Sequence, residues 1–277
     1  MSQQSGSNRL KPKLTGVPET LLWPLYNRAE DARRASPVLS DPRAIELVDA
    51  IDYPFREHFG RAWPIFSFRA LHFDREIRAF LEQHPDGTVV ALGEGLETQF
   101  YRVDNGRVRW LMVDLPETVE VRRQLLPDTD RHRTLACSAL DFRWMREVDD
   151  SKGVFITAQG LLMYFDPADV QRLLSGCAEH FQRGTMIFDV IPRWLRMQAR
   201  LGLYTAGRYR PPEMPWALPV KDIPTLASWH PNIARADEVE IGTGPGFALG
   251  VLLPVYRRLT PLWNLRPTIA RLTFGAR

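Results

Sequence analysis

Between residues 88 and 190 the chain alternates short apolar runs with amphipathic stretches. Five apolar runs rich in β-branched residues predict strands. They cover 88–92, 108–113, 133–137, 153–157 and 185–190. Amphipathic stretches fit between them, the clearest from Pro167 to about Phe181, with Asp166 as its N-cap. Strand–helix alternation of this kind predicts an α/β fold with a doubly wound, mostly parallel sheet.

Before this core the pattern is helical and broken. Residues 18–60 predict short helical pieces, one of which starts with Asp41 as N-cap and Pro42 in the first turn. Residues 74–84 predict a longer helix, because their apolar positions recur at the spacing of one helix face. Residues 1–17 are mostly polar, and we expect a flexible tail there.

After Ile191 the alternation stops. Residues 192–231 are rich in proline and tryptophan, which is typical of a lid or binding loop in a compact domain. A helical insertion that only packs on the surface is the alternative. Further strands near 237–241, 247–252 and 269–274 are expected to complete the sheet.

We therefore expect a single domain over residues 18–277, preceded by the tail. Its predicted parts are a helical N-terminal cover, a cofactor-binding core, a substrate lid and a set of C-terminal strands. These parts span 18–85, 86–191, 192–235 and 236–277.

Composition is that of an ordinary globular protein, with 44% hydrophobic and 25% charged residues. The net charge of +3 and the absence of a dense Lys/Arg stripe argue against a nucleic-acid partner. The longest apolar stretch, Phe247 to Tyr256, contains Pro254 and is too short to span a bilayer, so no membrane partner is predicted. Cys137 and Cys177 are expected to be buried thiols, since no secretory signal is seen and the cytoplasm is the expected compartment.

The strongest chemical signal is a pair of glycines after the first predicted strand. Gly93 and Gly95 flank Glu94, and such glycines let the backbone pass close to a ligand. About twenty residues on, the next strand ends in Asp114, where a carboxylate can accept ribose hydroxyls and also cap the following helix. Thr98 stands where a dinucleotide fingerprint has its third glycine. This favours an adenosyl cofactor without phosphates, such as S-adenosylmethionine.

Two more loops open at the same edge of the predicted sheet. Asp141 follows the third strand, where a carboxylate can accept the exocyclic amine of an adenine. Phe142 would pack either on that ring or in the core. The fourth strand leads into residues 157–165, where apolar side chains beside Gly160 suit a site wall or simply a buried strand end.

A series of motifs in this order resembles the leucine carboxyl methyltransferase family, near its bacterial branch of tetracenomycin-type polyketide O-methyltransferases. The resemblance covers about residues 20–192 well. Besides the glycine loop, the motifs are Leu25-Tyr26-Asn27-Arg28-Ala29-Glu30, Asp41-Pro42-Arg43-Ala44, Phe68-Arg69-Ala70-Leu71-His72-Phe73-Asp74, Val113-Asp114-Leu115-Pro116, Leu140-Asp141-Phe142-Arg143-Trp144 and Gln159-Gly160-Leu161-Leu162-Met163-Tyr164. It implies a Rossmann-like class I methyltransferase fold with seven strands, an N-terminal helical extension and a lid insertion.

The same resemblance implies roles for individual residues. Arg69 would pair with the carboxylate of the cofactor's methionine part, for which a guanidinium fork is suited. The implied cofactor-binding residues are Arg69, Gly93, Glu94, Gly95, Asp114, Leu115, Leu140, Asp141, Phe142, Gln159 and Gly160. The implied substrate residues are Tyr26, Arg28 and Glu30 over the pocket mouth. The residues themselves add Leu161 and Tyr164 on the site wall, and the aromatic composition of the predicted lid adds Trp216.

The chain departs from the family pattern at three positions. The family loop usually reads Leu-Gly-x-Gly-Leu-Asp-Thr-Arg, whereas Glu97 and Gln99 replace the Asp and the Arg here. Gln159 stands where the family usually has Glu, which removes a carboxylate near the sulfonium. A non-catalytic member that still binds the cofactor is therefore one alternative. A nicotinamide (NAD(P))-dependent oxidoreductase is another, disfavoured by Thr98.

The leading hypothesis is an S-adenosylmethionine-dependent O-methyltransferase that acts on a carboxylate or hydroxyl of a small polyketide-like or other secondary metabolite. A carboxylate is ionised at neutral pH and needs no base, whereas a hydroxyl benefits from one. His58, His72 and His230 are candidates by residue type alone, so no catalytic residue is predicted. No metal site and no oligomeric state are predicted either.

Overall fold

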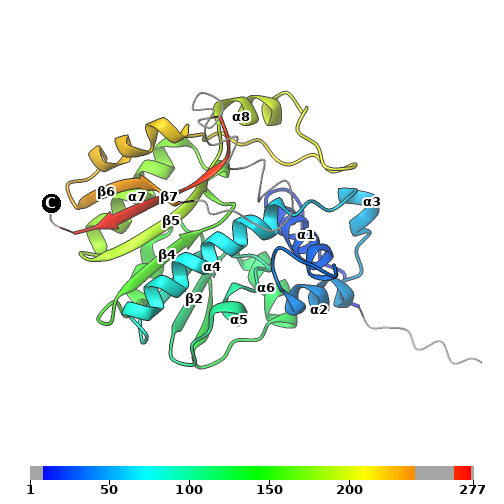
Figure 1. Ribbon diagram of the computed structural model, residues 1–277, viewed down its shortest axis with the longest axis horizontal. Coiled ribbons are helices and arrows are strands. Elements are labelled where there is room, and N and C mark those ends of the chain that lie inside the picture. Colours follow the sequence, from blue (N-terminus) through cyan, green and yellow to red (C-terminus); the bar gives the residue numbers. More distant parts are fainter. Residues whose placement is uncertain (1–8, 241–264, 276–277) are drawn as a thin grey trace, which may run out of the picture.

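The protein folds around a seven-stranded sheet in a computed structural model that describes residues 9–240 and 265–275 (Figure 1). The strand order is β3-β2-β1-β4-β5-β7-β6. The strands are β1 (Thr88–Leu92), β2 (Arg109–Asp114), β3 (His132–Ala136), β4 (Val154–Ala158), β5 (Gly184–Val190), β6 (Ile233–Glu238) and β7 (Thr268–Phe274). Strands β1 to β5 pair in parallel, and β7 pairs antiparallel with β5 and β6. The predicted α/β class and mostly parallel sheet are confirmed.

The five core strands lie within one residue of their predicted bounds. For β1, β2, β4 and β5 this is because buried parallel strands need mostly apolar runs, whereas the edge strand β3 buries only two of its five residues. The C-terminal strands are less regular in sequence. Strand β6 starts at Ile233, four residues before the predicted 237–241, since an edge strand buries only some of its residues. The strand predicted at 247–252 lies outside the described residues.

Helices cover both faces of the sheet (Figure 1). On one face lie α4 (Ile65–Gln83) and α5 (Gln99–Val103), whose apolar side chains pack on β1 and β4. On the other lie α7 (Pro167–His180) and the 3-10 segments η2 (Phe142–Glu147) and η4 (Val220–Ser228). Helix α7 matches its prediction closely.

Helix α4 begins at Ile65, nine residues before the predicted helix over 74–84. Its first half carries Ser67, Arg69 and His72 on positions where a helix that only packs on the sheet would carry apolar residues. These polar side chains interrupt the apolar stripe, and two of them line the cavity described below. The polar residues that interrupt the apolar pattern are therefore the reason why the start of α4 was not predicted, and two of them lie in the site.

The N-terminal segments form their own apolar cluster against the start of the core. They are η1 (Pro18–Leu21), α1 (Leu22–Ala32), α2 (Pro42–Ala50) and α3 (Phe55–Phe59). Their side chains pack with Leu96, which follows the glycine loop, and with Val121 of α6 (Pro116–Leu125). Asp41 caps α2 as predicted, because its carboxylate accepts the Ala44 N–H at 3.1 Å. The packing with Leu96 holds the N-terminal helices against the glycine loop.

Residues 192–231 divide between the two predicted roles. Helix α8 (Arg193–Arg200) places Leu195 on the wall of the cavity, and the residues after it place Tyr204 and Met214 there. Farther on, η4 buries its apolar side chains in the core beneath the sheet. One half of the segment therefore faces the site, and the other half only packs.

Cys137 and Cys177 are free and buried, as predicted. A further 3-10 segment, η3 (Leu162–Tyr164), follows β4. Over residues 9–240 and 265–275 we find no helix that combines the length and the apolar character needed to cross a bilayer.

Candidate cofactor and acceptor site

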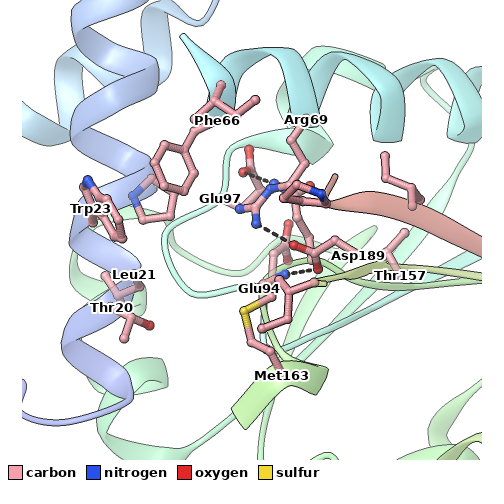
Figure 2. Close-up of a pocket in the computed structure, with 18 of the residues that line it drawn as sticks. Thr20, Leu21, Trp23, Phe66, Arg69, Glu94, Glu97, Thr157, Met163 and Asp189 are labelled. Atoms are coloured by element: carbon pink, nitrogen blue, oxygen red, sulfur yellow. Dashed lines mark hydrogen bonds and ion pairs between the residues drawn. The ribbon is translucent and has the colours of Figure 1, made fainter. Parts of the chain in front are cut away.

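A cavity of about 370 Å³ opens at the carboxyl ends of β1, β4 and β5, beneath α1 and α4. Figure 2 shows Arg69, Glu97 and Asp189 at its centre, with Trp23 and Phe66 on one side. Seven of the sequence-predicted site residues line it: Arg28, Arg69, Gly93, Glu94, Gln159, Gly160 and Tyr164. The tertiary structure therefore brings predicted residues from four segments of the chain to one place, at the edge where open α/β sheets bind ligands.

The glycine loop turns sharply after β1. Gly93 and Gly95 have φ angles of 61° and 58°, in the left-handed region that residues with a Cβ rarely adopt. A Cβ at Gly93 would lie 2.7 Å from Leu161, and one at Gly95 would lie 2.8 Å from Leu21. The backbone itself therefore requires both glycines, and two leucine side chains lie over them.

Asp114 supports the same loop from the end of β2. Its Oδ2 accepts the Gly95 N–H at 2.8 Å, and its Oδ1 accepts the Leu115 N–H at 2.8 Å. Burial raises the pKa of this carboxyl, although both N–H groups favour its ionised form. A carboxylate has about four lone-pair positions, so Asp114 can hold the loop and still accept other donors.

Arg122 of α6 also holds the loop, and sequence analysis missed it. Its buried guanidinium donates to the carbonyls of Gly95 at 2.6 Å and Glu97 at 3.0 Å. It also contacts Nε2 of His132 at 3.1 Å. Burial, followed by the Arg122 charge, lowers the pKa of His132 to about 3, so the neutral Nε2 accepts this hydrogen bond. The available signal was an arginine on the otherwise buried face of a predicted helix.

A buried network of ion pairs supports the far end of the loop. Arg28 lies 3.1 Å from Asp41 and 2.7 Å from Glu97. Arg102 contacts the same two carboxylates at 2.8 and 2.9 Å, and Asp74 at 2.7 Å. Burial by itself would raise the pKa of Glu97, but the two guanidiniums lower it to about 2.

Two of the departures from the family pattern belong to this network. Glu97 is the carboxylate that Arg28 and Arg102 share. Gln99 donates from Nε2 to Asp74 at 2.8 Å, beside the contact that Arg102 makes with the same carboxylate. Both unusual residues therefore have partners in the ion network that supports the loop.

Arg69 of α4 crosses to the end of β5. Its Nη1 donates to Oδ2 of Asp189 at 2.7 Å, and its guanidinium lies 5.4 Å from the ring centroid of Phe66. The other oxygen of Asp189 accepts the Gly160 N–H at 2.6 Å. Sequence analysis found Arg69 and Gly160 but missed Asp189, whose signal is an acid inside a buried apolar strand.

Several polar atoms on the cavity wall fit a polar ligand. Gln159 donates from Nε2 to Glu97 at 3.3 Å, while its buried Oε1 has no hydrogen-bond partner among the described residues. Glu94 accepts from Trp110 with Oε2, and its Oε1 is likewise unpaired within the described part of the chain. Buried polar atoms normally have partners, so such atoms around a glycine loop and Asp114 are consistent with an adenosyl amino acid as ligand.

The residues predicted to hold adenine lie outside the cavity wall. Asp141 is 39% exposed and pairs with Arg143, and Leu140 packs at the edge of the core. Phe142 packs against Gly176 of α7, where a Cβ would lie 2.6 Å from its ring. The core position that was one of the two alternatives for Phe142 is the one observed, and the adenine role of these residues stays a prediction.

Three predicted substrate residues point elsewhere. Tyr26 donates to the carbonyl of Gly60 at 3.1 Å, and Glu30 pairs with Arg33 at 3.3 Å. Trp216 is 4% exposed and packs against Phe188 of β5 in the core. Its backbone runs beside the end of the sheet, which turns the indole away from the cavity. Trp216 therefore does not line the cavity, and its proposed contact with the acceptor has no support in its position.

Of the three candidate histidines, His72 lines the cavity. Its Nδ1 lies 2.8 Å from the carbonyl of Phe68, which only accepts, so Nδ1 carries the proton. Burial lowers the pKa of His72 and favours the neutral ring. His58 and His230 lie outside the cavity wall, and no cluster of three metal-binding side chains occurs in the described ranges.

We expect Glu94→Gln to change how stability depends on pH. Burial raises the pKa of Glu94 to about 7 from a usual value of 4.5, against the opposing effects of Arg122 and Trp110. A raised pKa favours the protonated folded state, so the wild type loses stability as pH rises from about 4.5 to about 7. The loss is at most about 3.5 kcal/mol, at about 1.4 kcal/mol per pKa unit.

Urea unfolding at pH 5 and pH 8 measures this effect. The glutamine variant, which stays neutral, should gain stability relative to the wild type at the higher pH. A difference between the two proteins that is the same at both pH values would contradict the expectation.

Comparison with known proteins agrees with this geometry. The leucine carboxyl methyltransferase family model matches residues 22–178. The tetracenomycin polyketide synthesis O-methyltransferase TcmP of Streptomyces glaucescens is 36% identical over 185 residues, which is 66% of this chain and 68% of that protein. The S-adenosyl-L-methionine-dependent methyltransferase dpfgK of Gibberella zeae is 31% identical over 210 residues, 67% of this chain and 70% of that protein.

Among solved structures, an O-methyltransferase family protein from Burkholderia thailandensis is 15% identical, with a TM-score of 0.43, over 94% of this chain and 70% of that chain. The family match spans more than half of the 277 residues, and both sequence relatives are methyltransferases by name. A nicotinamide-dependent oxidoreductase finds no support in these comparisons. The chain therefore belongs to the leucine carboxyl methyltransferase family and is an S-adenosylmethionine-dependent methyltransferase.

Proposed function

We propose that this methyltransferase methylates an oxygen of a small aromatic metabolite of the polyketide type. The observation that supports this best is the aromatic wall of the cavity. Trp23 lies at ring-centroid distances of 5.0 Å from Phe66 and 5.8 Å from Tyr204, and all three line the cavity. Such a wall favours a flat apolar acceptor over a charged peptide. The name of the Streptomyces relative, a polyketide synthesis enzyme, agrees with this class.

The cofactor is proposed to lie along the carboxyl ends of the strands, with its amino-acid part beside β1, β4 and β5 and its adenosyl part toward β2 and β3. Arg69 pairs with its amino-acid carboxylate, and the backbone of Gly93 and Gly95 passes beside it. Asp114 accepts the ribose hydroxyls on the lone pair that Gly95, Leu115 and Thr118 leave open and on the one that the rotatable Thr118 hydroxyl gives up. The adenine lies over the loop that holds Asp141. The acceptor then reaches the methyl group from the aromatic wall.

When bound, S-adenosylmethionine supplies an activated methyl group, which passes to the acceptor oxygen as the carbon–sulfur bond breaks. The protein therefore mainly orients the acceptor and excludes water. Trp23 and Tyr204 hold the face of the acceptor. Burial raises the pKa of Tyr164 and keeps its hydroxyl protonated, so it can donate a hydrogen bond in the cavity.

Calorimetry with S-adenosylhomocysteine, followed by methyl transfer from labelled cofactor, tests the proposal. A panel of aromatic carboxylic acids and phenols should contain acceptors, whereas aliphatic acids of similar size should be poor ones. Binding without transfer to any acceptor would instead identify a non-catalytic member. No binding of S-adenosylhomocysteine would contradict the cofactor site itself.

We expect Tyr204→Ala to raise the KM for an aromatic acceptor about tenfold. An aromatic contact contributes about 0.5–1.5 kcal/mol beyond the area it buries, and both contributions are lost. The affinity for S-adenosylhomocysteine should change less than about twofold, which is a negligible change in binding free energy. Tyr101→Ala, on an exposed part of α5 away from the cavity, is the matched control. Equal changes in acceptor and cofactor affinity would contradict the proposed contact between Tyr204 and the acceptor.

A further inference from the structure

Strand β5 carries a carboxylate in a place where an apolar side chain is normal. Asp189 is 6% exposed, in a run of otherwise apolar buried residues. Side chains alternate along a strand, so Asp189 points to the same face as Ile187, which packs in the core beneath α4. The carboxylate is thereby aimed at Arg69 and at the cavity, which it lines. A buried carboxylate at the end of a strand costs stability unless its partners compensate, which favours a functional reason for it.

The Arg69–Asp189 pair presents opposite charges side by side in the cavity. Figure 2 shows Arg69 and Asp189 meeting across its centre. The side chain of Arg69 is 19% exposed and that of Asp189 is 9% exposed, so both are accessible from the cavity yet largely desolvated. Such a pair is complementary to a zwitterion, and the amino-acid part of S-adenosylmethionine is one.

A second oxygen acceptor lines the same cavity. Gln159 precedes Gly160, whose N–H donates to Asp189. The carboxylate of Glu97 can only accept, so it must receive the NH₂ group of Gln159, and this fixes which way the amide faces. The Oε1 atom then faces away from Glu97, buried and with no partner among the described residues. A neutral acceptor and a carboxylate therefore flank Gly160.

We propose that Asp189, together with Oε1 of Gln159, receives the α-ammonium group of the cofactor, while Arg69 takes its carboxylate. An ammonium carries three donors and a full positive charge, which one carboxylate and one amide oxygen match. Gln159 is neutral, so Asp189 supplies the negative charge for the ammonium group. This inference rests on the proposed cofactor site and adds a residue to it.

A different role for Asp189, as a competitor of the cofactor carboxylate for Arg69, predicts a change in cofactor affinity of the opposite sign. If Asp189 only occupied Arg69 in competition with the cofactor carboxylate, then removing its charge would free the guanidinium and tighten binding. If Asp189 instead receives the ammonium, removing its charge weakens binding, and only for ligands that carry the amino group. The sign of the change therefore separates the two.

The experiment is calorimetry on the full chain with three ligands: S-adenosylhomocysteine, its analogue without the amino group, and 5′-methylthioadenosine, which lacks the amino-acid part. Asp189→Asn should weaken S-adenosylhomocysteine ten- to a hundredfold, in the range of charged hydrogen bonds. The affinity for 5′-methylthioadenosine should stay within about twofold of the wild type, because the adenosyl contacts remain. Asp104→Asn, which removes a partly exposed carboxylate outside the cavity, is the matched control.

Wild-type measurements keep the proposal falsifiable if the variant does not fold. The wild type should bind the analogue without the amino group ten- to a hundredfold more weakly than S-adenosylhomocysteine. Equal affinities, tighter binding by Asp189→Asn, or equal losses for all three ligands would each overturn the role of Asp189. If the wild type bound none of the three, the cofactor site itself would be wrong, which is a distinct result.

Discussion

Asp114→Ala is expected to weaken the binding of S-adenosylhomocysteine roughly a thousandfold. The variant loses two ribose hydrogen bonds to a charged group, each contributing about 1.5–3 kcal/mol, and about 4 kcal/mol corresponds to a thousandfold in affinity. It also releases the Gly95 N–H, which Asp114 now holds at 2.8 Å, so the glycine loop loses a support. Calorimetry with S-adenosylhomocysteine measures the effect directly.

Two comparisons isolate this effect from general damage to the fold. Asp149→Asn changes a carboxylate that is 46% exposed and far from the loop, and it should bind like the wild type. Asp114→Asn keeps one oxygen but turns an NH₂ group toward backbone donors or ribose hydroxyls, so it should fall between the wild type and Asp114→Ala. A loss below tenfold in a folded Asp114→Ala protein would mean that another group holds the ribose.

Arg102→Met is expected to destabilise the protein by about 3–5 kcal/mol, because it leaves buried carboxylates without their cation. Arg102 is 6% exposed and contacts Asp41, Asp74 and Glu97 within 2.9 Å. Arg28 still pairs with two of these carboxylates, whereas Asp74 keeps, within the part of the chain that the structure describes, the neutral amide of Gln99 as its side-chain donor. At about 2–4 °C per kcal/mol for a chain of this size, Tm should fall by roughly 6–20 °C.

Urea unfolding followed by tryptophan fluorescence measures the free energy of unfolding of this variant. Arg109→Met is the matched control, since Arg109 forms one ion pair in which both side chains are about half exposed or more. It should cost less than about 1 kcal/mol, as exposed ion pairs do. A loss equally small for Arg102→Met would show that the network contributes little, and that the carboxylates find other partners or take up protons.

Together the two variants separate contact with the cofactor from support of the loop. Asp114 touches the loop at Gly95 and is proposed to touch the ribose. Arg102 does not itself line the cavity and reaches it only through Glu97, while Asp41 anchors it to α2. Its first effect should therefore appear in stability, with a smaller change in cofactor affinity.

Local patterns predicted most of the fold. The strands β1 to β5 were predicted to within one residue, and for β1, β2, β4 and β5 the reason is that their burial demands mostly apolar runs that are visible in the chain. The start of α4 was not, because Ser67, Arg69 and His72 interrupt the apolar periodicity. Two of these polar residues, Arg69 and His72, line the cavity, so the prediction of local structure failed where the site alters the pattern.

The candidate site was predicted in part. Residues that directly follow strands, such as Gly93, Asp114 and Gly160, could be assigned because the ends of parallel strands meet at one edge of the sheet. Arg122 and Asp189 could not, because each looks like an isolated polar residue in an amphipathic helix or an apolar strand. Trp216 was placed on the lid by composition, whereas its packing against Phe188 buries it in the core.

The order of apolar runs, turns and strand-end residues can be recognised in the sequence alone. It was enough to predict the sheet, the glycine loop and the family of this protein. Contacts between segments that are distant in sequence cannot be predicted from the spacing of apolar residues within one helix or strand, because they depend on how the helices pack across the sheet. Only the tertiary structure therefore decided that Glu97 and Gln99 belong to a buried ion network. It likewise decided that Arg69 of α4 meets Asp189 of β5, 120 residues away in sequence.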